Sequence, residues 1–477
     1  MNKLLICILS FAFFVDARQF KHPGISNSQA ELDQIKILAN APTNSVIKQG
    51  YLRMLKSDLS KLTYKPSPHD TVLVASGSVV PKGERDLNTG SSVAYAHALR
   101  WVVTGQQQYA NKAIEILNAW TIIKEIKISS GKLKLQDELE AAWYGPKWLA
   151  AAEIIRHYNK GAAGWSTTDI KKFTETFVAV FKRKALSWAG QPFAPNQGIS
   201  VSLHRMALGV FTDDSTLYLS GLNHFVNDIL NNNPAWQQAI LPSGEIWEIN
   251  RGTGGDCAHA SLNIEGIFNI AELAWNQGDN IYDDKIENDT LPRLLKGAEY
   301  FAEMLIAGPV KTTEEGLISC SGKRTLTYEI SYNHYTFRSK KNYSMPFSKQ
   351  FLEKEGRPSM GSMGKFLPWD TFTHGELNNG FTAIQPTVRS IPANHPFKQL
   401  KNSIHFSFDK TYGTRAIVEI YNLRGNRIQS LPLNHQGKVK WNLLSKSGKK
   451  VNEGTYIYSL KNSGIRTTQT NGLLFIQ

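Results

Sequence analysis

The sequence predicts a mainly α-helical domain, arranged as an array or toroid of helical hairpins, followed by a small all-β sandwich domain. Three observations predict this fold class. Amphipathic segments follow one another from about residue 28 to residue 308 without strand-like runs between them. Short alternating runs separated by glycine dominate the last 80 residues. Residues 384–397 contain three prolines, which is typical of a linker.

Each predicted helix has apolar residues at helical spacing and ends near Gly, Pro or Asn. The first clear helix, residues 93–103, places Ala94, Ala98 and Trp101 on one face and stops at Gly105, a good C-terminal signal. The others follow at residues 109–126, 133–158, 168–187, 199–211, 215–230, 256–277 and 291–306. Because no fixed-period repeat is present, a solenoid of identical units is not expected.

The predicted secondary structure changes from helical to extended after residue 308. Residues 316–320, 325–331 and 342–345 are predicted to be strands or extended loops. Beyond the linker, the predicted strands of the sandwich are residues 403–408, 416–422, 438–443, 454–460 and 472–476. The domains are therefore expected to be residues 18–383 and 398–477.

Charge is concentrated in the tail. The 477 residues include 54 Lys and Arg against 40 Asp and Glu, a net charge of +14. From Lys398 onward there are 13 basic and 3 acidic residues, or +10, so the other 397 residues carry only +4. We therefore expect no nucleic acid partner for the main body. The 41% hydrophobic content excludes a disordered chain or a fibre.

Residues 1–17 have the pattern of a secretory signal peptide. Lys3 supplies the positive start, residues 4–15 are apolar, and Ala17 ends a plausible cleavage site. No later segment approaches 18 apolar residues, so we expect no membrane span and a secreted or cell-surface location. Cys257 and Cys320 remain in the mature chain, and the sequence leaves open whether they pair.

The motifs of common cofactor sites are missing. The sequence contains no Cys/His pattern with zinc spacing, no P-loop and no dinucleotide-binding fingerprint. We therefore expect neither a cofactor nor a catalytic metal.

The densest polar stretch is residues 248–259. Asp256 is a suitable N-cap, which places His259 in the first helical turn, where the helix dipole disfavours the imidazolium form. A neutral His259 could accept a proton, and Arg251 could bind a carboxylate in bidentate fashion. The alternatives are a histidine packed against a loop and a surface ion pair.

A second polar cluster lies at residues 328–338. Strand alternation would place Tyr332 and His334 on one face, with Asn333 and Tyr335 on the other. Hydrogen-bonding aromatic residues at this density suit a sugar-binding or acid–base surface. A hydrogen-bonded core strand is the alternative.

Two further stretches are candidates for substrate contacts. Asn196 and Gln197 open a predicted helix, where Asn is often only an N-cap. Trp143, Tyr144 and Lys147 lie close together on another helix and could stack on sugar rings, although helical aromatic residues are often core residues.

Several motifs, in order, resemble the alginate lyase superfamily of polysaccharide lyases. They are His22-Pro23-Gly24-Ile25, residues 98–105 with 113–120, residues 271–278, the 328–338 block that ends at Arg338, and Arg357-Pro358. The resemblance spans residues 22–380. It implies an incomplete α/α toroid that cleaves uronic-acid polymers, alginate or glucuronan, by β-elimination, with an acidic polysaccharide as partner.

The resemblance also implies roles for individual residues. Abstraction of the C5 proton requires the adjacent carboxylate to be neutralised, a role that matches Asn196 with assistance from Arg251. His259 matches a family histidine and is the candidate base, while Tyr332 and Tyr335 compete for the role of acid. Gln197, Trp143, Tyr144, Lys147, Asn333, His334 and Arg338 are the candidate substrate-binding residues.

Two positions depart from the family pattern. Gln197 stands where many relatives have a histidine, so that contribution is missing. Gly255 stands where the Arg-Asp-x-x-His motif has its arginine, and Arg251 is the candidate replacement.

The tail resembles the C-terminal sorting domain of type IX secretion in Bacteroidota. The resemblance rests on residues 418–425, Trp441 and residues 454–458, and it implies the type IX secretion machinery as a partner. A basic carbohydrate-binding module is the alternative.

Two other functions remain open on the sequence. A glycoside hydrolase on the same helical scaffold could use paired carboxylates such as Glu140 and Asp256. A non-catalytic, glycan-binding surface protein would use the aromatic residues alone.

Overall fold

The computed structural model divides into two compact units, which are described separately. They lie within Arg18–Ile384 and within Gln385–Gln477. The described residues are 18–75, 81–129, 135–188, 195–231, 238–286, 289–322, 328–341, 343–359, 364–377, 397–400, 403–408, 416–422, 427–452, 454–462 and 471–476. The expected signal peptide and residues 384–396 of the expected linker lie outside them.

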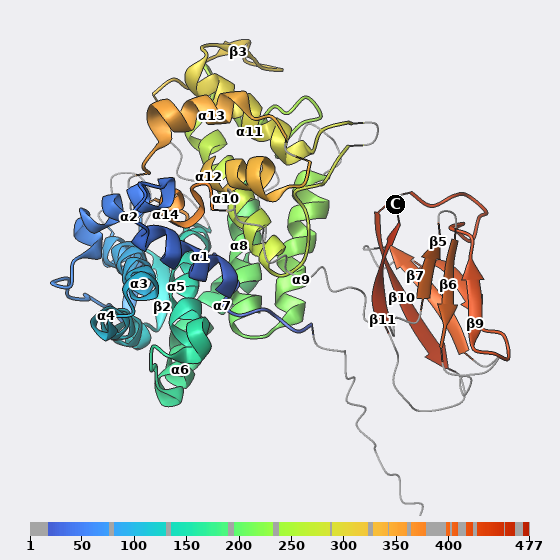
Figure 1. The fold of residues 1–477 in the computed structure, drawn as a ribbon, viewed down its shortest axis with the longest axis horizontal. Coiled ribbons are helices and arrows are strands. Elements are labelled where there is room, and N and C mark those ends of the chain that lie inside the picture. Colours follow the sequence, from blue (N-terminus) through green and yellow to red (C-terminus); the bar gives the residue numbers. More distant parts are fainter. Residues whose placement is uncertain are drawn as a thin grey trace, which may run out of the picture. The chain divides into compact units, whose positions relative to one another are not determined.

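The first unit is mainly helical (Figure 1). Its helices are α1 Gln29–Asn40, α2 Val46–Leu55, α3 Glu84–Thr104, α4 Gln107–Ala119, α5 Gln136–His157, α6 Thr167–Phe173, α7 Ala179–Ser187, α8 Pro195–Phe211, α9 Ser215–Asn223, α10 Cys257–Asn276, α11 Arg293–Ile306, α12 Tyr328–Tyr332, α13 Pro346–Phe351 and α14 Asp370–His374. A helix is present at each of the eight predicted positions, two of them with a π-helical segment, at residues 174–178 and 224–230. The helix predicted over residues 109–126 is too long, because it ends in a 3-10 turn at Trp120–Ile122 and residues 125–126 belong to a strand, Glu125–Ile128. Among the described residues, none of the helices combines the length and apolar character needed to cross a bilayer.

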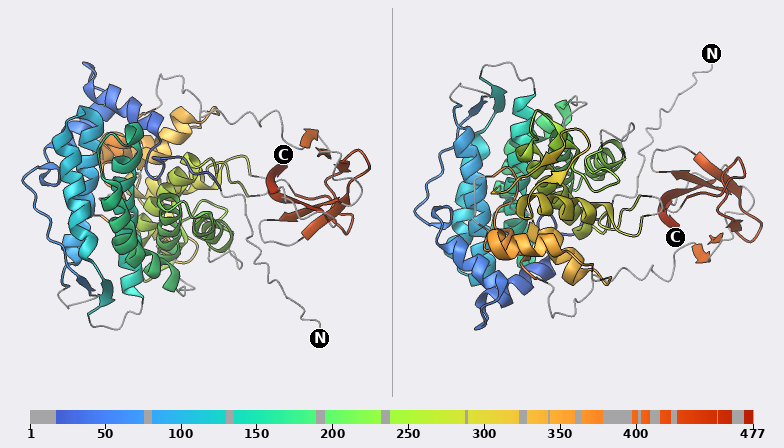
Figure 2. Two further views of the ribbon diagram at one scale, coloured as in Figure 1. Left: turned by 90° about the horizontal axis from the view of Figure 1, so that it is seen from below. Right: turned by 90° about the horizontal axis from the view of Figure 1, so that it is seen from above.

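The helices form two rows. Helices α3, α5, α8 and α10 pack against one another in chain order, while α4 packs on α3, α7 on α5 and α9 on α8. In Figure 2 the blue, teal and green helices accordingly stand side by side. This arrangement of hairpins confirms the predicted α/α fold class.

Close packing between the inner helices depends on small residues at particular positions. A Cβ atom on Gly90 of α3 would lie 2.9 Å from the ring of Trp148 on α5, so only glycine permits this approach. Trp148 and the neighbouring Trp120 are fully buried. The inner face of the helical unit is therefore a continuous aromatic and aliphatic core.

Short strands and a disulfide complete the helical unit. Strand β1 (Thr71–Val74) pairs in parallel with β2 (Glu125–Ile128), and β3 (Val310–Lys311) pairs antiparallel with β4 (Leu317–Ile318). Cys257 and Cys320 form a disulfide with a Cα–Cα distance of 5.6 Å, which answers the question that the sequence left open. The disulfide ties the first residue of α10 to the segment after β4.

The prediction of a strand over the 328–338 cluster is wrong. Helix α12 covers Tyr328–Tyr332, and a π-helical segment continues over residues 333–338. Helix α12 packs against α10, α11 and α14, and this tertiary packing overrides the β-propensity of the tyrosines. The pairing of Tyr332 with His334 on one strand face is therefore wrong as well. Residues 325–327 and 342 lie outside the described residues.

The second unit contains two antiparallel sheets, with strand orders β11-β10-β7-β8 and β5-β6-β9. Phe406 and Trp441 of one sheet share a buried core with Val418 and Tyr458 of the other. The predicted β-sandwich is confirmed, with two additional strands, β5 and β8. The strands are β5 Phe397–Leu400, β6 Ser403–Ser407, β7 Ala416–Asn422, β8 Arg427–Pro432, β9 Lys438–Trp441, β10 Gly454–Asn462 and β11 Asn471–Ile476.

Candidate active site

A buried carboxylate, Glu248, joins three segments of the helical unit. It is fully buried in a short 3-10 turn, Trp247–Asn250. Glu248 accepts hydrogen bonds from the backbone N–H of Asn196 at 2.9 Å, from the Asn196 side chain, from Arg251 Nη1 at 2.7 Å and from Asn263 Nδ2 at 2.7 Å. Burial raises the pKa of Glu248, although the bonds from Arg251 and Asn196 oppose this effect. Glu248 therefore fixes the side chains of Asn196, Arg251 and Asn263.

The side chains that Glu248 holds differ in accessibility. Asn196, the second residue of α8, is only 1% exposed, whereas the side chain of Arg251 is 38% exposed. Gln197 is half-buried beside Asn196. Arg251 is thus the accessible cation of the group, with the amide of Asn196 placed behind it by their shared contact with Glu248.

A histidine–aspartate pair lies at the start of α10. Asp256 caps the helix by accepting the backbone N–H of His259 at 3.1 Å, so the predicted N-cap is confirmed. Its other oxygen lies 2.6 Å from His259 Nδ1. Because an ionised carboxylate only accepts hydrogen bonds, this contact places a proton on Nδ1, so Nε2 is the ring nitrogen that can exchange a proton with a ligand. His259 has a side chain that is 46% exposed, so this nitrogen can reach a ligand.

Helix α10 brings the pair close to the Glu248 group. Asn263, which donates to Glu248, lies four residues after His259 and therefore on the same face of α10. The exposed imidazole and the Arg251 guanidinium consequently belong to one site built from α8, α10 and the turn before α10.

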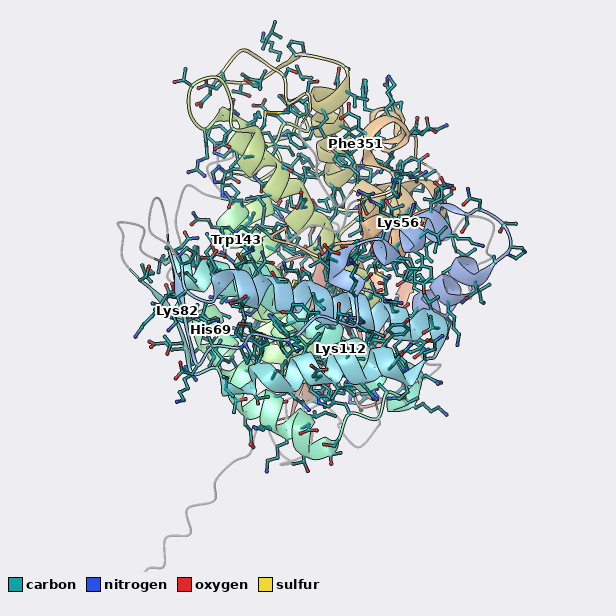
Figure 3. All side chains as sticks on the ribbon, turned by 90° about the vertical axis from the view of Figure 1, so that its left-hand side faces the viewer. Lys56, His69, Lys82, Lys112, Trp143 and Phe351 are labelled. Atoms are coloured by element: carbon teal, nitrogen blue, oxygen red, sulfur yellow. A yellow bond between two sulfur atoms is a disulfide. The ribbon has the colours of Figure 1, made fainter. Side chains whose placement is uncertain are left out.

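Trp143, which is labelled in Figure 3, connects helix α5 to this site through a hydrogen bond to α8. Its indole Nε1 donates to Ser200 Oγ at 3.1 Å, and Ser200 Oγ in turn donates to the carbonyl of Asn196 at 2.7 Å. The Trp143 ring retains 8% exposure. Ser200 thus fixes an aromatic ring next to the N-terminal turn of α8.

A lysine lies over this aromatic ring. Lys365 Nζ is 3.8 Å from the centroid of the Trp143 ring, 3.2 Å from the Tyr144 hydroxyl and 3.3 Å from Glu140 Oε2. Its side chain is 31% exposed. Burial and the charge of Glu140 raise the pKa of Tyr144, so its phenol stays protonated. Lys365 therefore adds a positive charge beside the aromatic ring.

Lys147 supports Lys365 from inside the protein. Its ammonium donates to Asn88 Oδ1 at 2.5 Å and to the carbonyl of Gly364 at 2.7 Å, and the side chain is fully buried. Burial lowers the pKa of Lys147. Lys147 therefore holds Gly364, the residue before Lys365, in place. Because its side chain is fully buried, Lys147 does not contact a polymer as the sequence analysis expected.

Tyr332 is partly accessible at the end of α12. The residue is 7% exposed, and the Arg357 guanidinium lies 5.6 Å from its ring centroid. Arg357 is itself paired with Glu329 and Glu376, each at 2.7 Å. Burial raises the pKa of Tyr332, which keeps its hydroxyl protonated.

The other residues of the 328–338 cluster lie in the core. The Tyr335 hydroxyl donates to the carbonyl of Tyr282 at 2.8 Å, and Arg338 donates to His334 Nδ1 at 3.0 Å and to Glu272 at 2.6 Å. Asn333 and Tyr335 have no exposed surface, and His334 is 2% exposed. In this conformation none of these side chains reaches a polymer, and their contacts are structural.

Sequence reasoning missed several members of the site. Glu248 opened the polar stretch of residues 248–259 but received no role of its own, and Asp256 was predicted as a helix cap and as one of two carboxylates of the alternative hydrolase. Asn263, Ser200 and Lys365 carried no sequence signal, because single polar residues in helices and loops are usually solvated.

Comparisons with known proteins point to one family. Residues 76–311 match the family model described as alginate lyase. A search of curated proteins found no match.

Among solved structures, similarity extends to an alginate lyase, A1-III, from Sphingomonas species A1 with 15% identity and a TM-score of 0.45, over 59% of this chain and 79% of that one. An alginate lyase from Bacteroides ovatus has 14% identity and a TM-score of 0.45, over 60% and 84%. A variant of A1-III complexed with a tetrasaccharide has 17% identity and a TM-score of 0.44, over 59% and 78%. At sequence identities this low, the roles of residues in those enzymes are not assigned to residues of this chain.

Proposed function

We propose a substrate class and a mechanism for this chain, starting from the match of its residues 76–311 to the family model described as alginate lyase. The substrate is a uronate polymer, alginate or glucuronan, and the reaction is β-elimination. The observation that carries the proposal is the pair formed by Asp256 and His259. His259 lies on the same face of α10 as Asn263, and both Asn263 and Arg251 donate hydrogen bonds to Glu248.

The first requirement of the reaction is to neutralise the uronate carboxylate. The C5–H bond is weakly acidic because the adjacent carboxylate is already negative, so a donor must stabilise the charge that develops there. Arg251 is exposed enough to bind this carboxylate, and Asn196 adds an amide dipole behind it. Glu248 keeps both side chains in place before substrate arrives.

The second requirement is a base. His259 takes the C5 proton on Nε2, and Asp256 stabilises the imidazolium that forms. The electron pair of the C–H bond forms the C4–C5 double bond, and the bond from C4 to the glycosidic oxygen breaks.

The third requirement is an acid for the departing oxygen. Among the tyrosines of the 328–338 cluster, Tyr332 retains the most exposed surface, 7%, and burial keeps its hydroxyl protonated. The proposal therefore gives the role of acid to Tyr332 and leaves Tyr335 out. Lys365 and Trp143 supply a positive charge and a flat ring for a neighbouring sugar.

The test of the proposed function is ultraviolet absorbance over time. Purified protein is offered polymannuronate, polyguluronate, glucuronan and a glycosaminoglycan separately. We expect absorbance to rise with one of the polyuronates, because β-elimination creates an unsaturated sugar end. New reducing ends without absorbance would identify a hydrolase instead, and binding without new ends would identify a glycan-binding protein.

Replacement of the two tyrosines by phenylalanine is expected to separate their roles. Tyr332→Phe removes the proposed acid and should lower kcat by about 10²–10⁴-fold. Tyr335→Phe should leave kcat unchanged but lower the free energy of unfolding by about 1–3 kcal/mol, since the carbonyl of Tyr282 loses its buried donor. Rates and urea unfolding of both variants are the measurements. Equal kcat in the two variants would contradict the assignment.

We also propose that the chain is exported and that the β unit is a type IX sorting signal. The pattern of residues 1–17 and the resemblance of residues 418–425 and 454–458 to such domains support this. Deletion of residues 398–477 in a Bacteroidota host should leave the protein in the periplasm. Normal release of the truncated chain to the cell surface would argue for a carbohydrate-binding module instead.

A further inference from the structure

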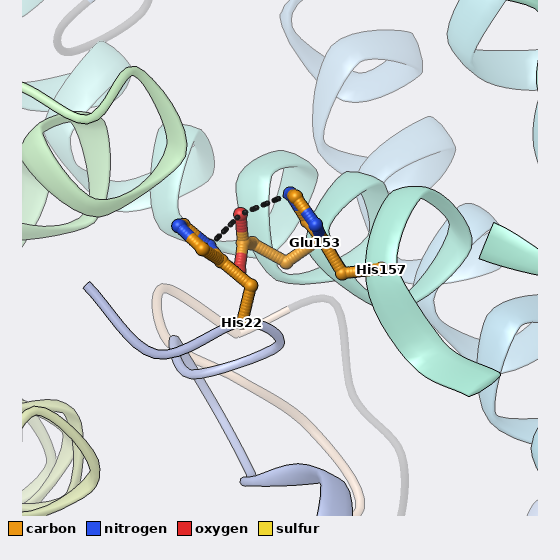
Figure 4. A group of neighbouring side chains, drawn as sticks. All are labelled: His22, Glu153 and His157. Carbon is orange, nitrogen blue, oxygen red and sulfur yellow. Dashed lines mark hydrogen bonds and ion pairs between the residues drawn. The ribbon is translucent and has the colours of Figure 1, made fainter. Parts of the chain in front are cut away.

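Two histidines and a glutamate converge where the segment before α1 meets the end of α5 (Figure 4). His22 Nδ1 lies 3.0 Å from Glu153 Oε2, and His157 Nε2 lies 3.6 Å from Glu153 Oε1. One ligand atom from each of the three residues falls within 4.8 Å of the other two. Glu153 is 1% exposed, and the two histidine rings stack with their centroids 4.3 Å apart.

We propose that His22, Glu153 and His157 bind one divalent transition-metal ion of the zinc type. Two imidazoles and one carboxylate are a ligand set that suits Zn²⁺ and is poor for Ca²⁺ or Mg²⁺, which prefer oxygen ligands. Bonds of about 2.0–2.1 Å in a tetrahedron place ligand atoms roughly 3.3 Å apart. The observed separations of 3.0 and 3.6 Å bracket this value.

The surroundings of the three ligands support a metal ion. The second nitrogen of His22, Nε2, lies 3.1 Å from Asp213 Oδ1. Histidines that ligate metals usually donate their other N–H to a carboxylate, which fixes the ligating tautomer. Asp213 would therefore hold His22 with the lone pair of Nδ1 directed at the ion.

His157 is the residue that an ordinary ion pair does not explain. Its Nε2 is buried and has no hydrogen-bond partner among the described residues, although it faces Glu153. A buried imidazole nitrogen without a hydrogen-bond partner is unfavourable, whereas a cation between His157 and Glu153 would be bound by both groups.

A bound ion would tie together parts of the chain that are far apart in sequence. His22 belongs to the segment before α1, Glu153 and His157 to α5, and Asp213 to the turn after α8. The expected consequence is that the metal stabilises the folded helical unit. No step of the proposed reaction depends on this ion.

The test uses the full mature chain, stripped with a chelator and then titrated with Zn²⁺. Bound zinc is measured by elemental analysis after gel filtration, and Tm is measured in parallel. We expect wild-type protein to bind one equivalent more than His157→Ala. At a Zn²⁺ concentration about 100 times Kd, the Tm of the wild-type protein should rise by roughly 2–5 °C, and that of the variant should not.

A matched control is His69→Ala. His69 pairs with a single carboxylate, Asp86, at 2.8 Å and has no second histidine in the group, so its loss should leave the zinc stoichiometry unchanged (Figure 3). Glu153→Gln is the second test variant, in case His157→Ala does not fold. Equal zinc binding by wild-type protein and by the folded test variant would overturn the proposal, as would a Tm response to Ca²⁺ as large as that to Zn²⁺.

Discussion

Replacement of His259 by alanine is expected to lower kcat on the polyuronate substrate by about 10²–10⁴-fold, because the proposed base is removed. The free energy of unfolding should change little, since the side chain is 46% exposed. The measurement is the initial rate of the ultraviolet signal, with urea unfolding in parallel.

Asp256→Asn tests the same pair more sharply. Asn caps a helix as well as Asp, so the stability of α10 should be preserved. The amide, however, can present its NH₂ group to Nδ1 of His259. That contact favours the tautomer with the proton on Nε2, which cannot accept another one. We therefore expect kcat to fall by at least about 100-fold while Tm stays unchanged.

The control for both substitutions is His69→Ala, which removes a histidine–carboxylate pair of the same kind elsewhere in the helical unit. Its kcat should equal that of the wild-type protein. Full activity in His259→Ala would remove His259 from the mechanism. Full activity in Asp256→Asn alone would show that the ring needs no orienting carboxylate.

Replacement of Glu248 by glutamine is the second prediction with a large effect. Glu248 accepts four hydrogen bonds, including those from the side-chain amides of Asn196 and Asn263. Glutamine has one oxygen and one NH₂ group, so a donor would face donors at a fully buried position. We expect the free energy of unfolding to fall by about 1–3 kcal/mol and kcat/KM to fall by at least about 100-fold, because Asn196 and Arg251 lose their fixed positions.

Glu245→Gln provides the matched control. Glu245 is also buried and accepts from Asn250 Nδ2 at 2.6 Å and from Thr313 N and Oγ1 at 2.9 and 2.7 Å. Its loss should reduce stability to a similar extent, but kcat/KM should remain near the wild-type value. A similar fall of kcat/KM in both variants would mean that Glu248 acts only through the stability of the fold.

Local patterns account for what could be predicted of the fold. The eight helices, the five sandwich strands and the cap at Asp256 depend on interactions between residues a few positions apart, which sequence periodicity reports directly. The prediction for residues 328–338 was wrong because their side chains alternate in a way that is typical of a strand. Packing of α12 between α10, α11 and α14 decides the outcome there.

Only the part of the candidate site that lies in local sequence motifs could be predicted. Asn196, Arg251 and His259 lie in motifs that a family resemblance can place. The accessible surface of Tyr332 and the burial of Tyr335, three residues later, follow only from the helix and its neighbours. Lys365 joins Trp143 across more than 200 residues of sequence, and no local pattern predicts such a contact.

The sequence by itself determined the class of the fold, the order of its elements and the match of residues 76–311 to the family model described as alginate lyase, because periodicity, caps and motifs are local properties of the chain. Only the tertiary structure decided that Cys257 pairs with Cys320, that Glu248 organises Asn196 and Arg251, and that His22 meets Glu153 and His157. These contacts join residues separated by up to 131 positions. The physical reason is that a long-range contact depends on how whole helices pack, which the spacing of residues along one helix does not encode.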